Sequence, residues 1–196
     1  MTGVQTCALP ILPIQGLVTI EPRFHDSTLR SVMADELIKT LNLVPHPLGG
    51  FYAETMRSKT TVKPLDNSGR DVRDAYSVIY CLLRGSDIDA WHKVKSEESI
   101  FYQKGSHVIL HMITEDGKYE TKTIGDPTVD PKAHFQYHVP KNVWFAVELE
   151  DKNSYCLLSV VVAPGFDFED CEFGEKEKML GMFPQHKDIV ETFCSK

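Results

Sequence analysis

The sequence predicts an all-β domain with a helix before it and short helices after it. Short runs rich in β-branched and aromatic residues recur at near-regular spacing between residues 49 and 164, as in a β-sandwich or barrel. The Asp116-Gly117 pair between two of these runs is a strong hairpin signal. The segments on either side carry helical patterns instead.

The N-terminal segment, residues 1–26, is expected to be a disordered or adventitious leader. It is apolar in patches but lacks a basic start, and Pro10 and Pro13 interrupt it, which disfavours a secretory signal peptide. A single domain is then expected over residues 27–196.

The first element of the domain is a predicted helix over Ser27–Leu43. Ser27 or Ser31 can cap its start, and the prolines at positions 45 and 47 end it. Its expected apolar stripe contains four residues, Val32, Met33, Leu37 and Leu41.

The β-region follows, with alternating or continuous apolar runs typical of strands. The predicted strands cover residues 49–58, 75–83, 99–103, 107–114, 119–125, 135–140, 143–149 and 154–164, with a further extended run around residue 92. Two short helices are expected at the end, over 174–183 and 185–193, with Pro184 between them.

Composition places the chain among ordinary globular proteins and excludes some partners. Its 196 residues, 42% hydrophobic and 25% charged, suffice for one domain with a substantial core. The net charge is −7 and no basic cluster offsets it, so no nucleic-acid partner is expected. No apolar run approaches the roughly 20 residues of a membrane span, so no membrane partner is expected.

The five cysteines favour a reducing compartment. They are scattered and form no C-x-x-C pair, and a chain of this size needs no disulfide staples, so a cytoplasmic location is expected. Cys81 and Cys156 lie within apolar strand runs, and we interpret them as inert packing.

The stretch AWHKVKSEESIFYQKG, residues 90–105, carries the first chemical signal. His92 is followed six residues later by Glu98, and Gly105 comes seven residues after that. Alternation along a strand puts His92 and Val94 on one face. A turn or bulge near Ser96 would then bring Glu98 to the same interior.

This spacing resembles the first cupin motif, which runs H-x-H, three residues, E, six residues, G. Val94 stands at the second histidine position. The second cupin motif, P-x-G-x-x-H, is similar to residues 140–145, where Asn142 replaces the glycine and Phe145 replaces the histidine.

Further segments resemble a small single-domain cupin branch with an RmlC-like jelly roll, whose members mostly lack an assigned activity. These are LNLVPHPLGGFYAET, AYSVIYCLL, VPKNVWFAVEL and VVAPGFDFEDCEFG, in that order, so the resemblance covers residues 34–193. It implies a double-stranded β-helix with a ligand pocket inside the barrel and a homodimer, whose two-fold partner would cover exposed edge strands.

Metal-binding cupins generally use three histidines and one glutamate. Val94 and Phe145 offer no lone pair, so no metal and no cofactor is expected. His111 or His138 could restore a ligand if either faced inward, but a lone strand histidine is more often hydrogen-bonded structure.

The remaining pair, His92 and Glu98, defines the candidate catalytic site. Burial and pairing move the pKa values of such groups toward the working range. The RmlC-like resemblance implies His92 as base and Tyr102 or Tyr80 as acid. The alternative is that the pair only orients a ligand.

A second candidate region is HPLGGFYAET, residues 46–55. The Gly49-Gly50 pair permits backbone that a side chain would forbid and leads into Phe51, Tyr52 and Glu54. An aromatic ring beside a carboxylate suits a sugar-like or heteroaromatic ligand; a tight turn with core aromatics is the alternative. Two more aromatic residues, Tyr80 and Trp144, are expected to contact the ligand.

Relatives usually carry polar residues where Leu48, Ala53 and Phe145 stand. If these positions line the pocket, the cavity is more apolar than theirs.

The acidic segment APGFDFEDCEFG, residues 163–174, is expected to point its aromatics inward and its charges into solvent. Alternatively, Asp167 or Asp170 reaches the pocket and orients His92.

The expected function is that of a metal-free cupin that binds a sugar-like or nucleotide-linked small molecule, with epimerase or isomerase acid–base chemistry. A non-catalytic binding or storage module is the main alternative. A metal-dependent oxygenase is a third, disfavoured by the missing ligands.

Overall fold

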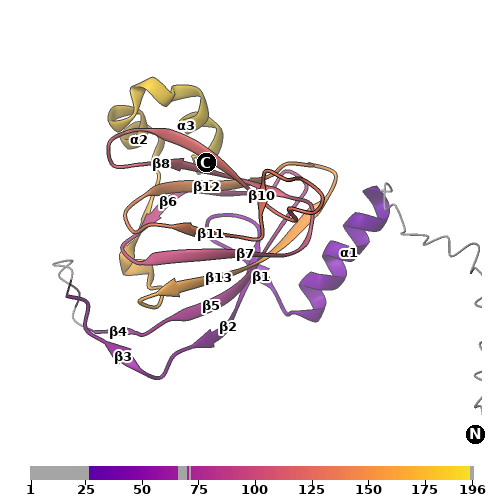
Figure 1. The fold of residues 1–196 in the computed structure, drawn as a ribbon, viewed down its shortest axis with the longest axis horizontal. Coiled ribbons are helices and arrows are strands. Elements are labelled where there is room, and N and C mark those ends of the chain that lie inside the picture. The colour runs from indigo at the N-terminus through magenta and orange to yellow at the C-terminus, as the bar shows by residue number, and fades with distance from the viewer. Residues whose placement is uncertain (1–26, 66–69, 71, 195–196) are drawn as a thin grey trace, which may run out of the picture.

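Two six-stranded sheets face one another in the computed structural model, which describes residues 27–65, 70 and 72–194 (Figure 1). The expected leader, residues 1–26, lies outside the described part. The first sheet has the order β1 (Val44–Pro45), β2 (Phe51–Arg57), β5 (Ser77–Arg84), β13 (Tyr155–Ala163), β7 (Glu97–Gly105), β11 (Gln136–Val139). The second has the order β10 (Ala133–His134), β9 (Tyr119–Ile124), β8 (Val108–Ile113), β12 (Trp144–Leu149), β6 (Ile88–Val94), β14 (Cys171–Phe173).

Neighbouring strands run antiparallel except β9 and β10, which are parallel. A separate two-stranded ribbon, β3 (Thr61–Val62) and β4 (Arg73–Asp74), extends from the end of the first sheet (Figure 1). This arrangement confirms the predicted all-β jelly roll, and the Asp116-Gly117 turn joins β8 to β9 as expected.

The interior between the sheets is filled by side chains that alternate inward along the strands. Both sheets contribute to one cluster that includes Leu110, Ile124, Phe145, Leu149 and Leu158, each at most 2% exposed. The predicted strands therefore bury the faces that their apolar patterns indicate.

One helix covers the outer face of the first sheet. Helix α1 (Ser27–Thr40) packs against Leu82 and Leu157. Its buried stripe begins at Ala34, which is fully buried, whereas Val32 is 53% exposed. The predicted stripe was thus wrong at Val32: the docked stripe is Ala34, Leu37, Ile38 and Leu41, which keeps the helical spacing.

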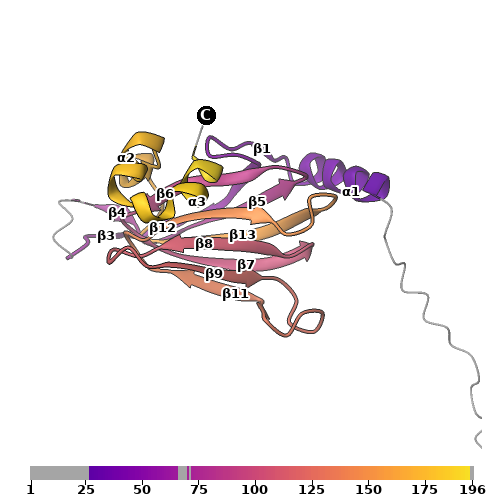
Figure 2. The same cartoon turned by 90° about the horizontal axis from the view of Figure 1, so that it is seen from above.

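The C-terminal segment covers the outer face of the second sheet (Figure 2). It contains α2 (Lys176–Met182), a 3₁₀ turn η2 (Pro184–His186) and α3 (Lys187–Phe193), so the two helices predicted around Pro184 are confirmed. Trp91 lies beneath them, packs edge-on against Phe193 and donates its indole N–H to the Ile189 carbonyl oxygen at 3.3 Å. None of the helices in the described residues is long and apolar enough to cross a membrane.

The Gly105→Ala substitution is expected to lower the free energy of unfolding by about 2 kcal/mol or more. Gly105 ends β7 at φ +108°, and a Cβ atom there would lie 2.1 Å from the carbonyl oxygen of Tyr155. Urea denaturation measures the change.

The matched control is Gly181→Ala in α2, where an added Cβ meets nothing within 4 Å. That substitution should raise stability by about 0.5–1 kcal/mol because alanine favours the helix. Equal effects at the two positions would refute the steric explanation for Gly105.

Candidate active site

A cavity of about 340 Å³ lies inside the barrel, within the size range of small-molecule sites. Eight of the lining residues are aliphatic, and they come from both sheets and the turn before β2: Leu48, Ile79, Leu83, Ile100, Val147, Leu158, Val160 and Val162. Seven lining residues can carry charge: His46, Glu54, Arg57, Asp89, His92, Glu98 and Asp167. The cavity is therefore apolar in its walls but rich in titratable groups.

A bulge in β6 brings two of these groups together. Phe145 of β12 pairs with His92 of β6. Val147 lies two residues after Phe145 in β12, but its partner Asp89 lies three residues before His92 in β6. One extra residue in β6 is thus accommodated, and strict alternation is broken between Asp89 and His92. Both side chains consequently reach the cavity, while Trp91 between them points to the outer face.

His92 is held as a neutral base. Its Nδ1 lies 2.7 Å from the carbonyl oxygen of Ala90. Because that oxygen only accepts, Nδ1 carries the hydrogen and the neutral ring keeps its lone pair on Nε2. Burial lowers the pKa of His92, although nearby Glu98 opposes the change. The ring of Phe145 packs against it at a centroid distance of 4.0 Å.

Two carboxyl groups flank this histidine. Burial raises the pKa of Asp89 to about 7, with His46 opposing the shift. Burial also raises the pKa of Glu98 to about 7, with His92 opposing and Asp89 adding to the shift. Near neutral pH each group can therefore give up or take a proton.

His46 completes the group from the connection between β1 and β2. Its Nδ1 accepts the backbone N–H of Leu48 at 3.2 Å, so Nε2 carries the hydrogen of the neutral ring. Burial lowers its pKa, with Asp89 opposing. The turn that presents His46 needs Gly49, at φ +118°, because a Cβ there would lie 2.0 Å from the Ile88 carbonyl oxygen.

A second bulge, in β2, shapes the cavity mouth. The register against β5 shifts between Glu54 and Met56, which allows Glu54 and Arg57 both to line the mouth. Arg57 donates to both carboxylate oxygens of Glu54 at 2.9 and 2.6 Å and to Asp74 at 3.0 Å. It also donates from two nitrogens to the carbonyl oxygen of Phe166.

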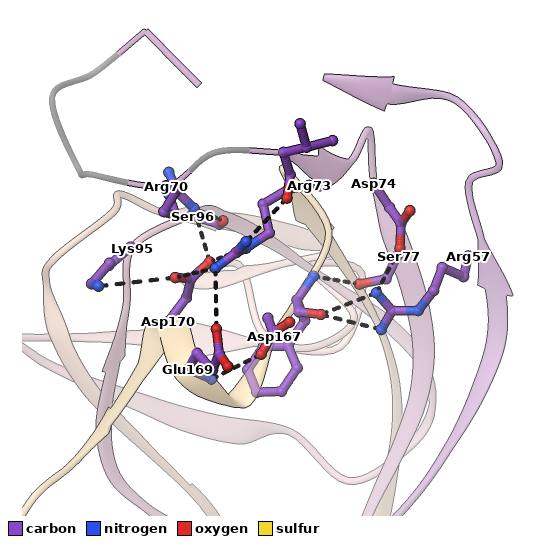
Figure 3. A network of polar contacts seen from close by, with 12 residues as sticks. Arg57, Arg70, Arg73, Asp74, Ser77, Lys95, Ser96, Asp167, Glu169 and Asp170 are labelled. Carbon is purple, nitrogen blue, oxygen red and sulfur yellow. Dashed lines mark hydrogen bonds and ion pairs between the residues drawn. The ribbon is translucent and has the colours of Figure 1, made fainter. Parts of the chain in front are cut away.

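The opposite wall of the mouth is the segment after β13, which ends in the 3₁₀ turn η1 (Phe168–Asp170) (Figure 3). Asp170 anchors it. Its carboxylate, 2% exposed, accepts hydrogen bonds from Arg73 at 2.9 and 3.2 Å and from Arg70 at 3.3 Å. Burial would raise the pKa of Asp170, but the two arginines outweigh it and the pKa is lowered.

The structure corrects the expectation for this acidic segment. Asp170 is buried in an ion pair rather than solvated, whereas Phe168 and Phe173 are 49% and 41% exposed. Asp167 lines the cavity, as one alternative proposed. Its carboxylate accepts the backbone N–H of Glu169 and caps η1. The buried ion pairs of Asp170 and the cap made by Asp167 therefore override simple alternation in this loop.

Four of the predicted site residues line the cavity: His92, Glu98, Tyr52 and Glu54. Three others, Phe51, Tyr80 and Trp144, do not line it in the described structure, and their expected ligand contacts are corrected. Each occupies the outer face of its strand, because its neighbours in the strand point inward. Phe51 and Tyr80 pack under α1, and Trp144 packs under the C-terminal helices with Lys93 over its ring.

Tyr102 is also corrected as a site residue. It shares the inward face of β7 with Glu98 and Ile100 but lies toward the other end of the strand, outside the cavity lining. Its hydroxyl donates to the carbonyl oxygen of Gly105 at 2.8 Å, and burial raises its pKa to about 12.

Of the three positions where relatives usually carry polar residues, two line the cavity and one does not. Leu48 and Phe145 line the cavity, whereas Ala53 packs on the outer face under α1. Cys81 also lines the cavity, and burial raises the pKa of its thiol well above the usual value. The thiol is therefore protonated, consistent with inert packing.

The donor set does not fit a cupin metal centre. Phe145 packs on the His92 ring where the motif has a histidine, and Val94 is buried without a donor atom. His111 lies outside the barrel between Tyr119 and Glu148, and His138 is exposed. In the described part of the chain, no three histidine, cysteine or acidic side chains are grouped to hold a metal.

Three cavity residues were missed by reasoning from the sequence: His46, Asp89 and Arg57. Asp89 and Arg57 sit beyond bulges, so alternation gives the wrong face for them. His46 lies in a turn, where no periodicity applies; its place three residues before the Gly49-Gly50 pair is the one signal that could have indicated it.

Comparison with known proteins agrees with the fold. A family profile described as "Cupin superfamily (DUF985)" matches residues 35–174. The uncharacterized protein YML079W of Saccharomyces cerevisiae is 32% identical over 157 residues, which is 72% of this chain and 76% of the yeast protein.

Two solved structures are similar over most of the chain. A hypothetical protein from Leishmania major superposes with a TM-score of 0.76 and 29% identity, covering 83% of this chain and 99% of that one. Protein SO0799 from Shewanella oneidensis gives a TM-score of 0.73 and 32% identity, covering 83% and 97%.

The Asp170→Asn substitution is expected to lower the free energy of unfolding by about 3 kcal/mol, because it removes the buried carboxylate that pairs with Arg70 and Arg73. The pKa of Asp170 is lowered in the fold, so its stabilisation is present above the unfolded carboxyl pKa of about 4 and is lost as pH falls below that value. Urea denaturation at pH 7 and at lower pH measures both effects.

The control is Glu169→Gln. The side chain of Glu169 is 82% exposed and lies near Arg73, one of the two arginines that Asp170 contacts. It should change stability by less than about 0.5 kcal/mol. An Asp170→Asn effect no larger than that of the control would refute the anchoring role.

Protein purified without a polyhistidine tag is expected to retain well below one equivalent of any divalent transition metal, because two ligand positions lack donor atoms. Elemental analysis measures the content. A second sample incubated with zinc and then dialysed separates loss during purification from lack of affinity, and one retained equivalent in either sample would contradict the prediction.

Proposed function

The chain belongs to the DUF985 family of the cupin superfamily, and from this premise we propose that its barrel cavity binds a small sugar-like molecule and moves a proton on it, as an isomerase or epimerase does. The observation that carries the proposal is the buried group of His46, Asp89, His92 and Glu98 at a cavity of about 340 Å³.

The protonation states support the chemistry. A neutral imidazole with a free Nε2 lone pair is a base suited to remove a proton from carbon next to a carbonyl group. A carboxyl with a pKa near 7 is a suitable acid for the carbonyl oxygen. His92 and Glu98 meet these requirements.

The step balances without a cofactor. The C–H bond breaks as its proton passes to Nε2 of His92, and the electron pair forms the C=C bond of an enol while Glu98 protonates the carbonyl oxygen. Return of a proton to the same carbon from either face, or to the neighbouring carbon, gives the epimer or isomer. The N–H of His46 Nε2 can hold the substrate oxygen throughout.

Neighbouring walls support sugar binding. Tyr52 and Phe145 present aromatic surface beside carboxylates, a combination that suits the apolar faces and hydroxyl groups of a sugar. A second candidate function is a non-catalytic binding module. It is favoured by Phe145 and Leu48, which make the cavity wall apolar at positions where relatives usually carry polar residues.

His92→Gln and Glu98→Gln are each expected to slow solvent deuterium exchange into a carbonyl sugar by at least about 100-fold, because each removes one proton-transfer group. The measurement is NMR of keto and aldo sugars incubated with the protein in deuterated buffer, after a thermal-shift screen selects those that bind.

The matched control is His138→Gln, an exposed histidine outside the cavity, which should exchange at the wild-type rate. Wild-type exchange in both active-site variants would refute the acid–base roles. Binding without exchange by the wild-type protein would favour the binding module instead.

A further inference from the structure

The charge balance of the cavity points to the class of ligand. Four carboxyl groups line it, Glu54, Asp89, Glu98 and Asp167, against one guanidinium, that of Arg57. No other lysine or arginine lines it within the described residues.

Arg57 has little capacity left for a ligand. All three nitrogens of its guanidinium are engaged, by the carboxylates of Glu54 and Asp74 and by the carbonyl oxygen of Phe166. An anionic ligand would have to compete with two carboxylates for this group, which disfavours a phosphate at the mouth.

The histidines do not supply the missing positive charge. His46 and His92 both have pKa values lowered by burial, and both are neutral near pH 7. Each also commits one ring nitrogen to the backbone, at Leu48 N–H and at the Ala90 carbonyl oxygen. The positive charge that would neutralise the inner carboxyl groups is therefore not provided by these side chains.

The side chain of Asp89 shows the effect of this lack of positive charge. Its Oδ1 is buried and has no hydrogen-bond partner among the described residues. The nearest basic atom is Nδ1 of His92 at 3.8 Å, whose hydrogen is already donated elsewhere. The side chain stays 17% accessible and lines the cavity, so a group entering the cavity can approach it. A buried carboxyl left in this state is unfavourable until a partner arrives.

Aromatic rings complete the environment. Tyr52, Phe145, Phe166 and Phe168 line the same cavity, and Phe166 and Phe168 stand edge-to-face at 5.0 Å. Aromatic faces beside carboxylates are the combination that recognises ammonium groups, through cation–π attraction together with direct charge pairing.

We propose that the cavity recognises an organic cation, a small molecule bearing an ammonium group, and discriminates against phosphorylated ligands. This inference rests on the proposed function for its site and narrows its substrate to the amine-bearing class, such as an amino sugar. Asp89 supplies the counter-charge, Glu98 remains the acid of the proposed reaction, and the aromatic rings enclose the cation.

The test compares matched probes by calorimetry at pH 8. Choline is paired with its uncharged isostere, in which a quaternary carbon replaces the nitrogen. Glucosamine is compared with glucose and glucose phosphate at pH 7 instead, because its amino group is largely deprotonated at pH 8. The ammonium member of each set is expected to bind at least about tenfold more tightly than its neutral partner. An equally tight neutral member, a tighter phosphate, or no binding by either cation overturns the proposal.

Asp89→Asn separates this role from packing. The variant keeps the shape of the side chain and removes a group that ionises unfavourably in the fold, so it should fold and unfold at a temperature no lower than wild type. It is expected to lose at least about tenfold in choline affinity. Glu115→Gln, an exposed site outside the cavity, is the control and should bind as wild type; unchanged affinity in Asp89→Asn overturns the proposal.

The pH profile gives an independent readout. Choline keeps its charge, so its affinity should rise between about pH 5.5 and 8 as Asp89 ionises, and Glu98 titrates over the same range. The other titratable or charged side chains that line the cavity around Asp89 and Glu98 are those of His46, Tyr52, Glu54, Arg57, Cys81, His92 and Asp167. A flat profile contradicts the assignment of the counter-charge to Asp89.

The two proposals fail separately. A neutral sugar whose deuterium exchange depends on His92 but not on Asp89 would keep the proposed function and overturn the cation inference. Tight binding of an ammonium compound without any proton exchange would overturn the proposed reaction and keep the cation inference.

Discussion

Burial of ionisable groups in an incompletely filled barrel is the constraint on which the rest of this structure depends. Side chains from both sheets close the interior at one end, among them Ile124 and Leu149 of the second sheet and Cys156 of the first. At the other end the interior stays hollow and holds Asp89 and Glu98. Removal from water favours the uncharged form of each, so the fold itself sets protonation states that free solution would not give.

Reasoning from the sequence recovered the fold because period-two patterns and turn residues are local signals. It recovered His92 and Glu98 because their spacing matches a motif whose geometry includes the turn between β6 and β7. It missed Asp89 because a bulge adds one residue that no pattern reveals. It misplaced Phe51, Tyr80 and Trp144 because aromatic residues suit either face of a sheet whose outer surfaces are covered by helices. Asp170 was misjudged because its partners, Arg70 and Arg73, are about 100 residues away in the chain.

The replacement of metal ligands and the state of the carboxyl groups are connected. A divalent cation would supply positive charge beside Glu98 and hold its pKa low. Phe145 packs on His92 in the place of a ligand and offers no donor atom for such a cation, and burial is the largest influence on the two carboxyl groups. The same substitution that removes a metal donor therefore leaves behind acids with pKa values near 7 and an aromatic wall, which are the two features that the proposed chemistry and the proposed cation recognition need.

Arg57 links the shape of the mouth to the charge of the ligand. By donating to the Phe166 carbonyl oxygen it holds the segment that carries Phe166, Asp167 and Phe168 against β2. Asp170 holds the other end of that segment through Arg70 and Arg73. Since Arg57 is committed to this structural contact and to two carboxylates, it is withdrawn from ligand binding. The position of this wall of the mouth and the commitment of Arg57 to protein groups thus follow from one set of hydrogen bonds, and a change at Arg57 would alter both together.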